Sequence, residues 1–269
     1  MQVGVCYAID PENLQDIKVS VKDEGADFIE GHCYNLAILE QTQFDRVIAY
    51  TRDIGLPLNC LYSFLGKMDV FDTPELYKAA QEYVKRTFAR FADTDVKHIA
   101  FGGGKSRASN ANRSIAETKK MFAEFCAETV APLARDYGYT VGIEPLNSGE
   151  TDTYTTAVET YELIRELDLP QIKMNLDYFH FNKENENVSD LHNYASSISH
   201  LHIASIERFF PRPEHNESEN YLRFLTAVLP HVDPETTLSI EGRLSKPIGI
   251  SFGYLRALLK EAKERVSHG

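Results

Sequence analysis

Three carboxylates and one imidazole in the second half of the chain each follow or end a short apolar run that is typical of a β-strand. Glu144 ends TVGIE, Asp177 ends IKMNLD, His202 lies in ISHLHI, and Glu241 ends TLSIE. Predicted helices separate the four runs, and in a (β/α)8 barrel that order brings the strand ends together at one face. Oxygen-rich ligation with one imidazole suits a divalent metal ion, with Mn²⁺, Mg²⁺ or Co²⁺ favoured and Zn²⁺ possible.

The whole chain alternates between strand and helix patterns. Strands are predicted over residues 3–6, 28–31, 58–62, 98–101, 140–144, 172–177, 199–203 and 237–241, with helices between them that include one from about Pro11 and others over 39–54, 73–91 and 112–137. An open doubly wound sheet is the structural alternative, but the GxGxxG that such a sheet carries after its first strand is absent from the sequence. We therefore expect a (β/α)8 TIM barrel that forms a single domain over residues 1–269, an ordinary length for α/β barrels.

Strand parity supports the four candidate ligands independently of their residue types. Side chains alternate across a strand, so Glu144 points away from the face that Val141 and Ile143 share. The same alternation separates the other three candidates from the apolar residues of their strands. We expect the apolar set to face the helices and the polar set to face the barrel axis. Polar groups on that axis cost stability unless something binds them.

The composition is that of an ordinary folded protein with a strong negative charge. Of the 269 residues, 43% are hydrophobic and 25% are charged, and the formal net charge is −12. That charge disfavours nucleic acid as a partner, and small neutral or metal-masked substrates fit it better. The sequence has neither a signal-peptide pattern at its start nor an apolar run of the roughly 20 residues that span a membrane. We expect a cytoplasmic protein without a membrane partner.

The four cysteines, Cys6, Cys33, Cys60 and Cys126, are widely spaced and show no CxxC pairing. Three of them lie in or beside predicted barrel strands. Cysteine is among the most frequently buried residue types, so we expect buried thiols rather than disulfides or metal ligands. A reducing compartment agrees with this expectation.

The chain resembles the sugar isomerases and epimerases of the xylose-isomerase-like barrels, a group that includes D-tagatose 3-epimerase and D-psicose 3-epimerase. The order Glu, Asp, His, Glu on the last four predicted strands matches the metal site of that group. Three further matches are Glu150 in EPLNSGE, His180 in DYFH and Arg208 in HIASIERFFP. The resemblance implies that these three residues contact substrate, and that a homodimer or homotetramer is possible.

The resemblance also implies a reaction, in which a sugar or polyol ketone loses the proton on the carbon next to its carbonyl. The cis-enediolate that forms carries negative charge, which a divalent ion stabilises as a Lewis acid. Inversion of that carbon needs a base on one face of the intermediate and an acid on the other. The group assigns its two catalytic glutamates to the positions of Glu144 and Glu241, so both residues are expected to move protons as well as bind metal.

Four further residues are candidates for the mouth of the barrel. Glu30 and His32 follow or end the second predicted strand and either line the mouth or form a local ion pair or hydrogen bond. Lys105 and Arg107 lie in FGGGKSRASN after the fourth strand. This turn is not a Walker A loop, because Ile99 stands where that motif needs glycine. It either binds a carboxylate or phosphate or is a simple tight loop.

Several other functions remain open at this stage. Hydroxypyruvate isomerases and inosose dehydratases or isomerases share the barrel and a similar ligand set, and a dehydratase would use the same enediolate. An endonuclease-IV-like DNA repair enzyme is disfavoured, because its multinuclear zinc centre needs more histidines at strand ends and a basic surface. A non-catalytic sugar-binding barrel would leave the two acid/base glutamates unexplained.

Overall fold

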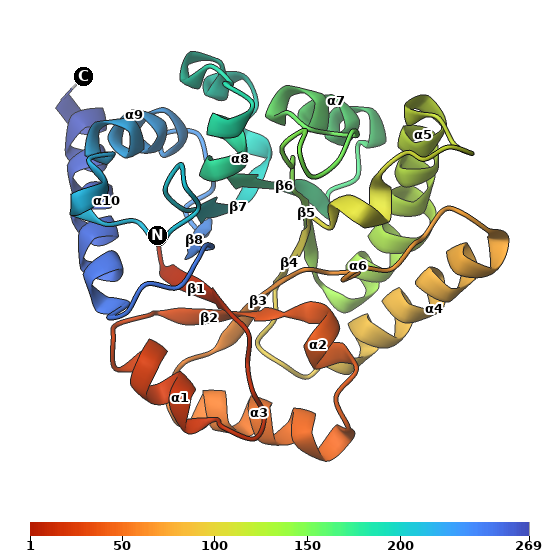
Figure 1. Ribbon diagram of the computed structural model, residues 1–269, viewed down its shortest axis with the longest axis horizontal. Helices are drawn as coiled ribbons and strands as arrows, with labels where there is room; N and C mark the ends of the chain where they lie inside the picture. The colour runs from red at the N-terminus through yellow and green to blue at the C-terminus, as the bar shows by residue number, and fades with distance from the viewer. Residues whose placement is uncertain (269) are drawn as a thin grey trace.

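The computed structural model, which describes residues 1 to 268, is a closed barrel of eight parallel strands surrounded by helices (Figure 1). Each strand pairs with its neighbours in sequence, and β1 pairs with β8 to close the ring. The strands are β1 (Val3–Tyr7), β2 (Phe28–His32), β3 (Leu58–Tyr62), β4 (His98–Phe101), β5 (Thr140–Ile143), β6 (Ile172–Asp177), β7 (Ile198–Ile203) and β8 (Thr237–Ile240). The predicted TIM barrel is confirmed.

The helices cover the outside of the ring. They are α1 (Gln15–Ile17), α2 (Cys33–Ala37), α3 (Gln41–Asp53), α4 (Pro74–Phe91), α5 (Ile115–Phe125), α6 (Ala131–Tyr137), α7 (Ala157–Leu167), α8 (Tyr178–Lys183), α9 (Ser218–Val228) and α10 (Gly249–His268). Local sequence fixes several of their ends. The Thr73 side chain accepts a hydrogen bond from the backbone N–H of Leu76 ahead of Pro74, and Gly138 ends α6 in the left-handed conformation.

The structure corrects the bounds of three predicted helices. The helix expected over 112–137 begins at Ile115, because Ser114 and Glu117 form a capping box there, and a wider π-helical turn, Cys126–Val130, lies between α5 and α6. The helix expected from Pro11 begins at Gln15. The helix expected over 39–54 spans Gln41–Asp53. The short helices α2 and α8 were not predicted, since each is little more than one turn.

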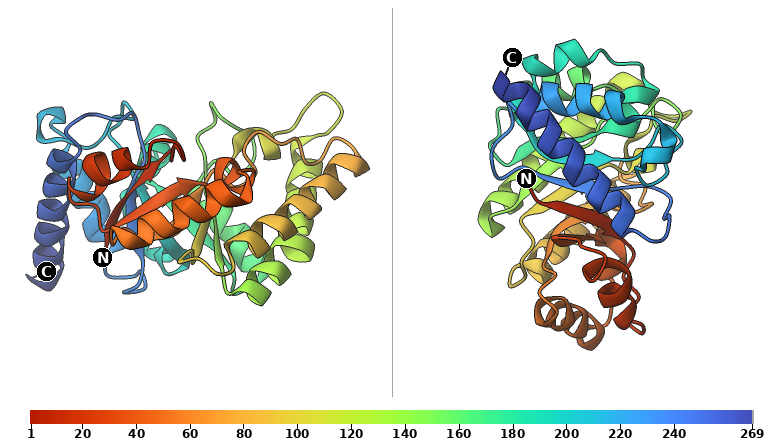
Figure 2. Two further views of the ribbon diagram at one scale, coloured as in Figure 1. Left: turned by 90° about the horizontal axis from the view of Figure 1, so that it is seen from below. Right: turned by 90° about the vertical axis from the view of Figure 1, so that its left-hand side faces the viewer.

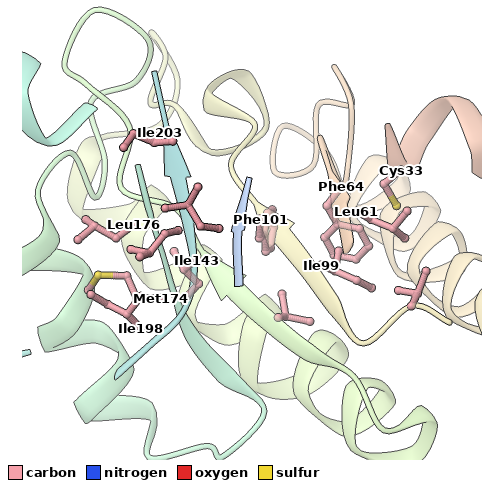
Figure 3. Close-up of a cluster of buried hydrophobic side chains, with 14 of the residues drawn as sticks. Cys33, Leu61, Phe64, Ile99, Phe101, Ile143, Met174, Leu176, Ile198 and Ile203 are labelled. Atoms are coloured by element: carbon pink, nitrogen blue, oxygen red, sulfur yellow. The ribbon is translucent and has the colours of Figure 1, made fainter. Parts of the chain in front are cut away.

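One continuous apolar layer lies between the strands and the helices. Figure 3 shows part of it, with Ile143, Met174, Leu176 and Ile203 among the side chains drawn. These four are fully buried and take the strand parity that the sequence assigned to the helix-facing side. Burial of such side chains is the main favourable term in the stability of the barrel.

The interior of the barrel is unusually polar. Glu30 on β2 contacts His200 on β7 across 170 residues of sequence, and the rings of His98 and His200 lie 4.9 Å apart. Neither pair comes from adjacent strands, so both contacts cross the barrel. Barrel interiors are usually filled by branched apolar residues, and here the axis instead carries a hydrogen-bonded polar column.

Figure 2 shows that both termini lie at the face of the barrel where the strands begin. The residues with candidate chemistry lie at the other end of β5 to β8. No helix in the described part of the chain is both long and apolar enough to cross a membrane.

Gly142 provides a test of how tightly the axis is packed. A Cβ atom at Gly142 would lie 2.6 Å from His98 Nε2 and 3.0 Å from Asn175 Cβ. We expect Gly142→Ala to lower the free energy of unfolding by about 1–3 kcal/mol, the usual cost of overpacking. Urea denaturation followed by circular dichroism measures this.

The matched control is Gly253→Ala, at an exposed position in α10 where a Cβ would have nothing within 4 Å among the described residues. This change should raise stability by about 0.5–1 kcal/mol through helix propensity. Equal stabilities of the two variants would show that the axis is loosely packed.

Candidate metal centre and active site

The four predicted ligands converge at the carboxyl ends of adjacent strands. Asp177 is the last residue of β6, His202 lies one residue before the end of β7, and Glu144 and Glu241 directly follow β5 and β8. The backbone N–H groups of the two glutamates still donate to the neighbouring strands, to Phe101 O at 3.1 Å and Ile203 O at 3.1 Å. One ligand atom from each of the four side chains lies within 4.8 Å of the others.

His202 lies at the centre of this cluster, and its two ring nitrogens have different partners. Nδ1 lies 3.0 Å from Glu144 Oε1 and 3.3 Å from Glu241 Oε2. Nε2 lies 3.1 Å from Glu30 Oε1, on the side away from the other carboxylates. A carboxylate on the far nitrogen of a metal-binding histidine fixes the tautomer and the orientation of the ring. Nδ1 is therefore the nitrogen that is presented to a metal ion.

The electrostatics of the cluster show competition between burial and opposite charge. Burial alone would lower the pKa of His202, but the nearby Glu30 carboxylate and its acidic neighbours raise it well above the usual value. Burial would raise the pKa of Glu241, but His202 and Arg208 outweigh it and lower that pKa to about 2. Asp177 has a pKa well above normal, because it is buried and close to the Glu241 and Glu144 carboxylates. The site has a shortage of positive charge.

The donor set fits a divalent cation. Asp177 is fully buried, and its Oδ2 has no hydrogen-bond partner among residues 1 to 268, whereas its Oδ1 accepts from the backbone N–H of Phe179 at 2.7 Å. An orphaned buried carboxylate oxygen is costly unless an ion or a proton binds it. Three carboxylates and one imidazole would supply oxygen-rich ligation to such an ion.

The predicted substrate contacts lie beside the four ligands. His180 is buried in α8, and its Nε2 lies 3.7 Å from Asp177 Oδ2. Glu150 Oε1 accepts from Arg208 Nη1 at 2.8 Å and from Asn147 Nδ2 at 2.9 Å. Asn147 also donates its backbone N–H to His180 Nδ1 at 3.2 Å, so it connects the histidine to the glutamate. Burial, together with the charge of Arg208, lowers the pKa of His180 to about 3, and its ring is neutral.

Arg208 spans the mouth between two carboxylates. Its Nη2 lies 3.5 Å from Glu241 Oε2, and its guanidinium carbon lies 4.8 Å from the centre of the Phe179 ring. Its backbone is left-handed, with φ of 63°, and its carbonyl accepts from Arg243 N at 2.7 Å. The loop after β7 is thus fixed at the residue whose side chain faces the site.

Two residues lie deeper than expected, and their assignment to the mouth is wrong. Glu30 is fully buried inside the barrel, since it is the third residue of β2 and points to the axis. Arg107 is also fully buried, because the short turn Gly104–Arg107 bends the chain back, and its Nη2 donates to the Glu144 carbonyl. Burial lowers the pKa of Arg107 to about 10. An anion entering the mouth would not contact either side chain.

The other two mouth candidates remain near the surface. Lys105 is exposed, and His32, the last residue of β2, caps α2 by accepting from Asn35 N at 3.3 Å. His32 also lines a cavity of about 470 Å³ with Tyr34 and Lys67. Asn147 and Asn175 were missed as site residues. Strand parity was the available signal for Asn175, whose Nδ2 lies 3.1 Å from His202 Nδ1.

The four cysteines are all free, and three are buried, as predicted, while Cys6 is half-buried. Cys6 Sγ lies 3.8 Å from His202 Nε2, on the Glu30 side of that ring. The thiols therefore pack in the interior and form no cross-links.

The chain belongs to the xylose isomerase-like TIM barrel family, which it matches over residues 20–228. It is 23% identical over 222 residues to a ketose 3-epimerase from Arthrobacter globiformis, an alignment that covers 77% of this chain and 73% of that enzyme. It is 25% identical over 194 residues to a D-psicose 3-epimerase from Enterocloster bolteae, with 70% and 64% of the two chains covered. The resemblance to sugar epimerases of this family is confirmed.

Solved structures share the fold along almost the whole chain. A 3-keto-D-glucoside 4-epimerase from E. coli superimposes with a TM-score of 0.79 at 22% identity and covers 96% of this chain and 99% of its own. An L-ribulose 3-epimerase superimposes with a TM-score of 0.81 at 17% identity, covering 99% and 97%. These structural neighbours are isomerase-class enzymes.

Glu30 should control metal binding without touching the ion. Replacing its carboxylate in Glu30→Gln removes the charged acceptor that orients His202, so we expect Mn²⁺ to bind roughly 10- to 100-fold more weakly. Isothermal titration calorimetry measures this. The matched control is Glu217→Gln, another buried glutamate, which instead accepts from the backbone N–H of Ile206. Equal affinity of both variants would contradict the role of Glu30.

Proposed function

We propose that this protein is a divalent-metal-dependent sugar epimerase that inverts the carbon next to a ketone. One observation carries the proposal: Glu144 and Glu241, on strands three apart in the ring, lie on the same His202 nitrogen, within reach of a buried Asp177 oxygen that lacks a partner among the described residues. A single ion at this point would bring both glutamates to one bound sugar. Mn²⁺, Mg²⁺ or Co²⁺ suits the ligands best.

The reaction needs a proton acceptor and a proton donor on opposite faces of one carbon. One glutamate, as the carboxylate, takes the proton from that carbon, and the electron pair of the C–H bond moves into the carbonyl to give a cis-enediolate. The other glutamate, as the carboxylic acid, returns a proton to the opposite face and inverts the centre. The metal ion, when bound, stabilises the negative charge on the oxygens. Which glutamate acts as the base depends on the configuration of the substrate.

The neighbouring residues would hold the sugar in register. Arg208 donates to Glu150 and lies beside Glu241, so it can donate to a substrate oxygen from the same position. His180 is neutral, and its Nε2, which has no hydrogen-bond partner within residues 1 to 268, is available to a hydroxyl or a carbonyl oxygen. Positioning of this kind contributes to the rate by holding the reacting carbon near both glutamates.

The names of the relatives point to one shared chemistry. A ketose 3-epimerase inverts the carbon next to a ketone at C2, and a 3-keto-D-glucoside 4-epimerase inverts the carbon next to a ketone at C3. Both reactions need a proton to leave and return at a carbon beside a carbonyl. We therefore infer a ketose or a keto-sugar derivative as the substrate class.

Two neighbouring reactions use the same first step. An isomerase would return the proton to the adjacent carbon, and a dehydratase would expel a hydroxyl from the enediolate. A DNA-repair reaction is disfavoured further by the structure, because His98 begins β4 and lies at the opposite end of the barrel from the site.

Solvent exchange tests the proposal. In D₂O with Mn²⁺, the protein should incorporate deuterium beside the carbonyl of a ketose or 3-keto-sugar and form its epimer, as followed by NMR. Glu144→Gln and Glu241→Gln should each slow exchange by roughly 10²- to 10⁴-fold, since each removes one acid/base group. A chelator should stop exchange, and added Mn²⁺ should restore it.

The matched control is Glu207→Gln, an exposed residue next to Arg208 in the same loop, which should exchange at the wild-type rate. Metal affinity is measured for each variant, so that loss of the ion is separated from loss of the proton carrier. Incorporation of deuterium without an epimer, but with an aldose or a dehydrated product, would replace the epimerase reading. Full exchange in both glutamate variants would overturn the mechanism.

A further inference from the structure

A second cluster of metal-ligand side chains lies inside the barrel, nearer the face where the strands begin. Cys60 is the third residue of β3, His98 the first of β4, and His200 the third of β7. One ligand atom of each lies within 4.8 Å of the others, and the side chains are 2%, 6% and 0% exposed. None of the three belongs to the Glu144 centre.

The hydrogen bonds present lone pairs in this cluster. Glu30 Oε2 accepts from His200 Nε2 at 2.9 Å, so the proton of the neutral ring lies on Nε2 and the lone pair on Nδ1. That Nδ1 lies 2.6 Å from the Thr237 hydroxyl, and Cys60 Sγ lies 3.8 Å from the same hydroxyl. The thiol and the imidazole thus approach one polar point, and a carboxylate supports the imidazole from behind.

His98 adds an unpaired nitrogen. Its Nδ1 is buried and has no hydrogen-bond partner in the described part of the chain, while its Nε2 lies 3.0 Å from Ser199 Oγ. Burial and the neighbouring His200 lower the pKa of His98 well below its usual value, so the ring is neutral, which is the form that binds metal. A buried ring nitrogen without a partner normally has a structural cost.

A cavity of about 530 Å³ reaches this cluster from the face where the strands begin. Cys60, His98, Ser199 and Thr237 line it, and exposed Lys97 and Asp233 lie at its rim. The cavity supplies a path for an ion and room for a water molecule. A site with three protein ligands and an accessible fourth position is a common zinc arrangement.

We propose that Cys60, His98 and His200 form a second metal site, selective for Zn²⁺ and similar thiolate-binding transition metals, at the base of the barrel. The thiolate sets the preference, because soft sulfur ligands select zinc over Mn²⁺ or Mg²⁺. Tetrahedral Zn²⁺ with Zn–N of about 2.0 Å and Zn–S of about 2.3 Å places ligand atoms roughly 3.3–3.6 Å apart, so the side chains must close by about 1 Å. Binding releases the Cys60 thiol proton to solvent.

Glu30 connects this site to the centre above it. Its Oε2 accepts from His200 and its Oε1 from His202, so one carboxylate orients an imidazole of each cluster. An ion on His200 Nδ1 keeps the proton on Nε2, and that keeps His200 as a donor to Glu30. The base site would therefore stabilise the support under His202 without contacting substrate.

Cobalt is a direct probe, because a thiolate ligand gives a sulfur-to-cobalt charge-transfer band in the near ultraviolet that oxygen and nitrogen ligands do not give. Wild-type protein titrated with Co²⁺ should develop that band and bind one ion more per chain than Cys60→Ser, which should lack the band. Asp177→Asn should keep the band, since it alters only the other centre. The matched control Cys126→Ser, which removes another buried thiol, should behave as wild type.

Zinc X-ray absorption on the unaltered protein gives a test that does not depend on a variant's folding. With Zn²⁺ bound, the spectrum should contain one sulfur neighbour at about 2.3 Å, because the Glu144 centre has no sulfur ligand. Absence of that sulfur, or a Cys60→Ser variant with the cobalt spectrum and stoichiometry of wild type, would overturn the proposal. Neither result would bear on the epimerase reaction, which rests on the other cluster.

Discussion

Carboxylates buried around one imidazole repel one another unless positive charge lies among them, and this constraint organises the upper part of the barrel. Asp177 has a raised pKa and an oxygen without a hydrogen-bond partner in the described chain, and His202 has a raised pKa because acidic groups surround it. A proton on the imidazole relieves only part of this repulsion. A divalent cation would relieve more, and the ligands that bind it would include the two groups able to carry the substrate proton.

The same constraint explains why the interior is polar. Glu30 is buried without a basic residue beside it, and two imidazoles stabilise its charge, His200 at 2.9 Å and His202 at 3.1 Å. A purely apolar interior would leave His202 free to rotate and to expose either nitrogen. The polar column therefore trades some hydrophobic stabilisation for a fixed direction of the ligand, as other metal sites do through their outer hydrogen bonds.

The positions of the ligands could be predicted from sequence because strand parity has a period of two and the carboxyl ends of parallel strands share one face. The same logic was not enough for Glu30, because its partner His200 lies 170 residues away and the depth of a residue along the axis depends on the register of all eight strands. Arg107 was misplaced for a different reason: a single short turn reverses the chain and buries a side chain that its sequence neighbours suggest is exposed. Asn147 has no signal of its own, since it acts by joining Glu150 to His180.

Anomalous diffraction from crystals grown with Mn²⁺ tests the central claim most directly. The account predicts one manganese peak at roughly 2.0–2.3 Å from oxygens of Glu144, Asp177 and Glu241 and from His202 Nδ1, with His202 Nε2 still on Glu30. A peak bound through His202 Nε2, or a peak elsewhere with the four side chains unaltered, would contradict it.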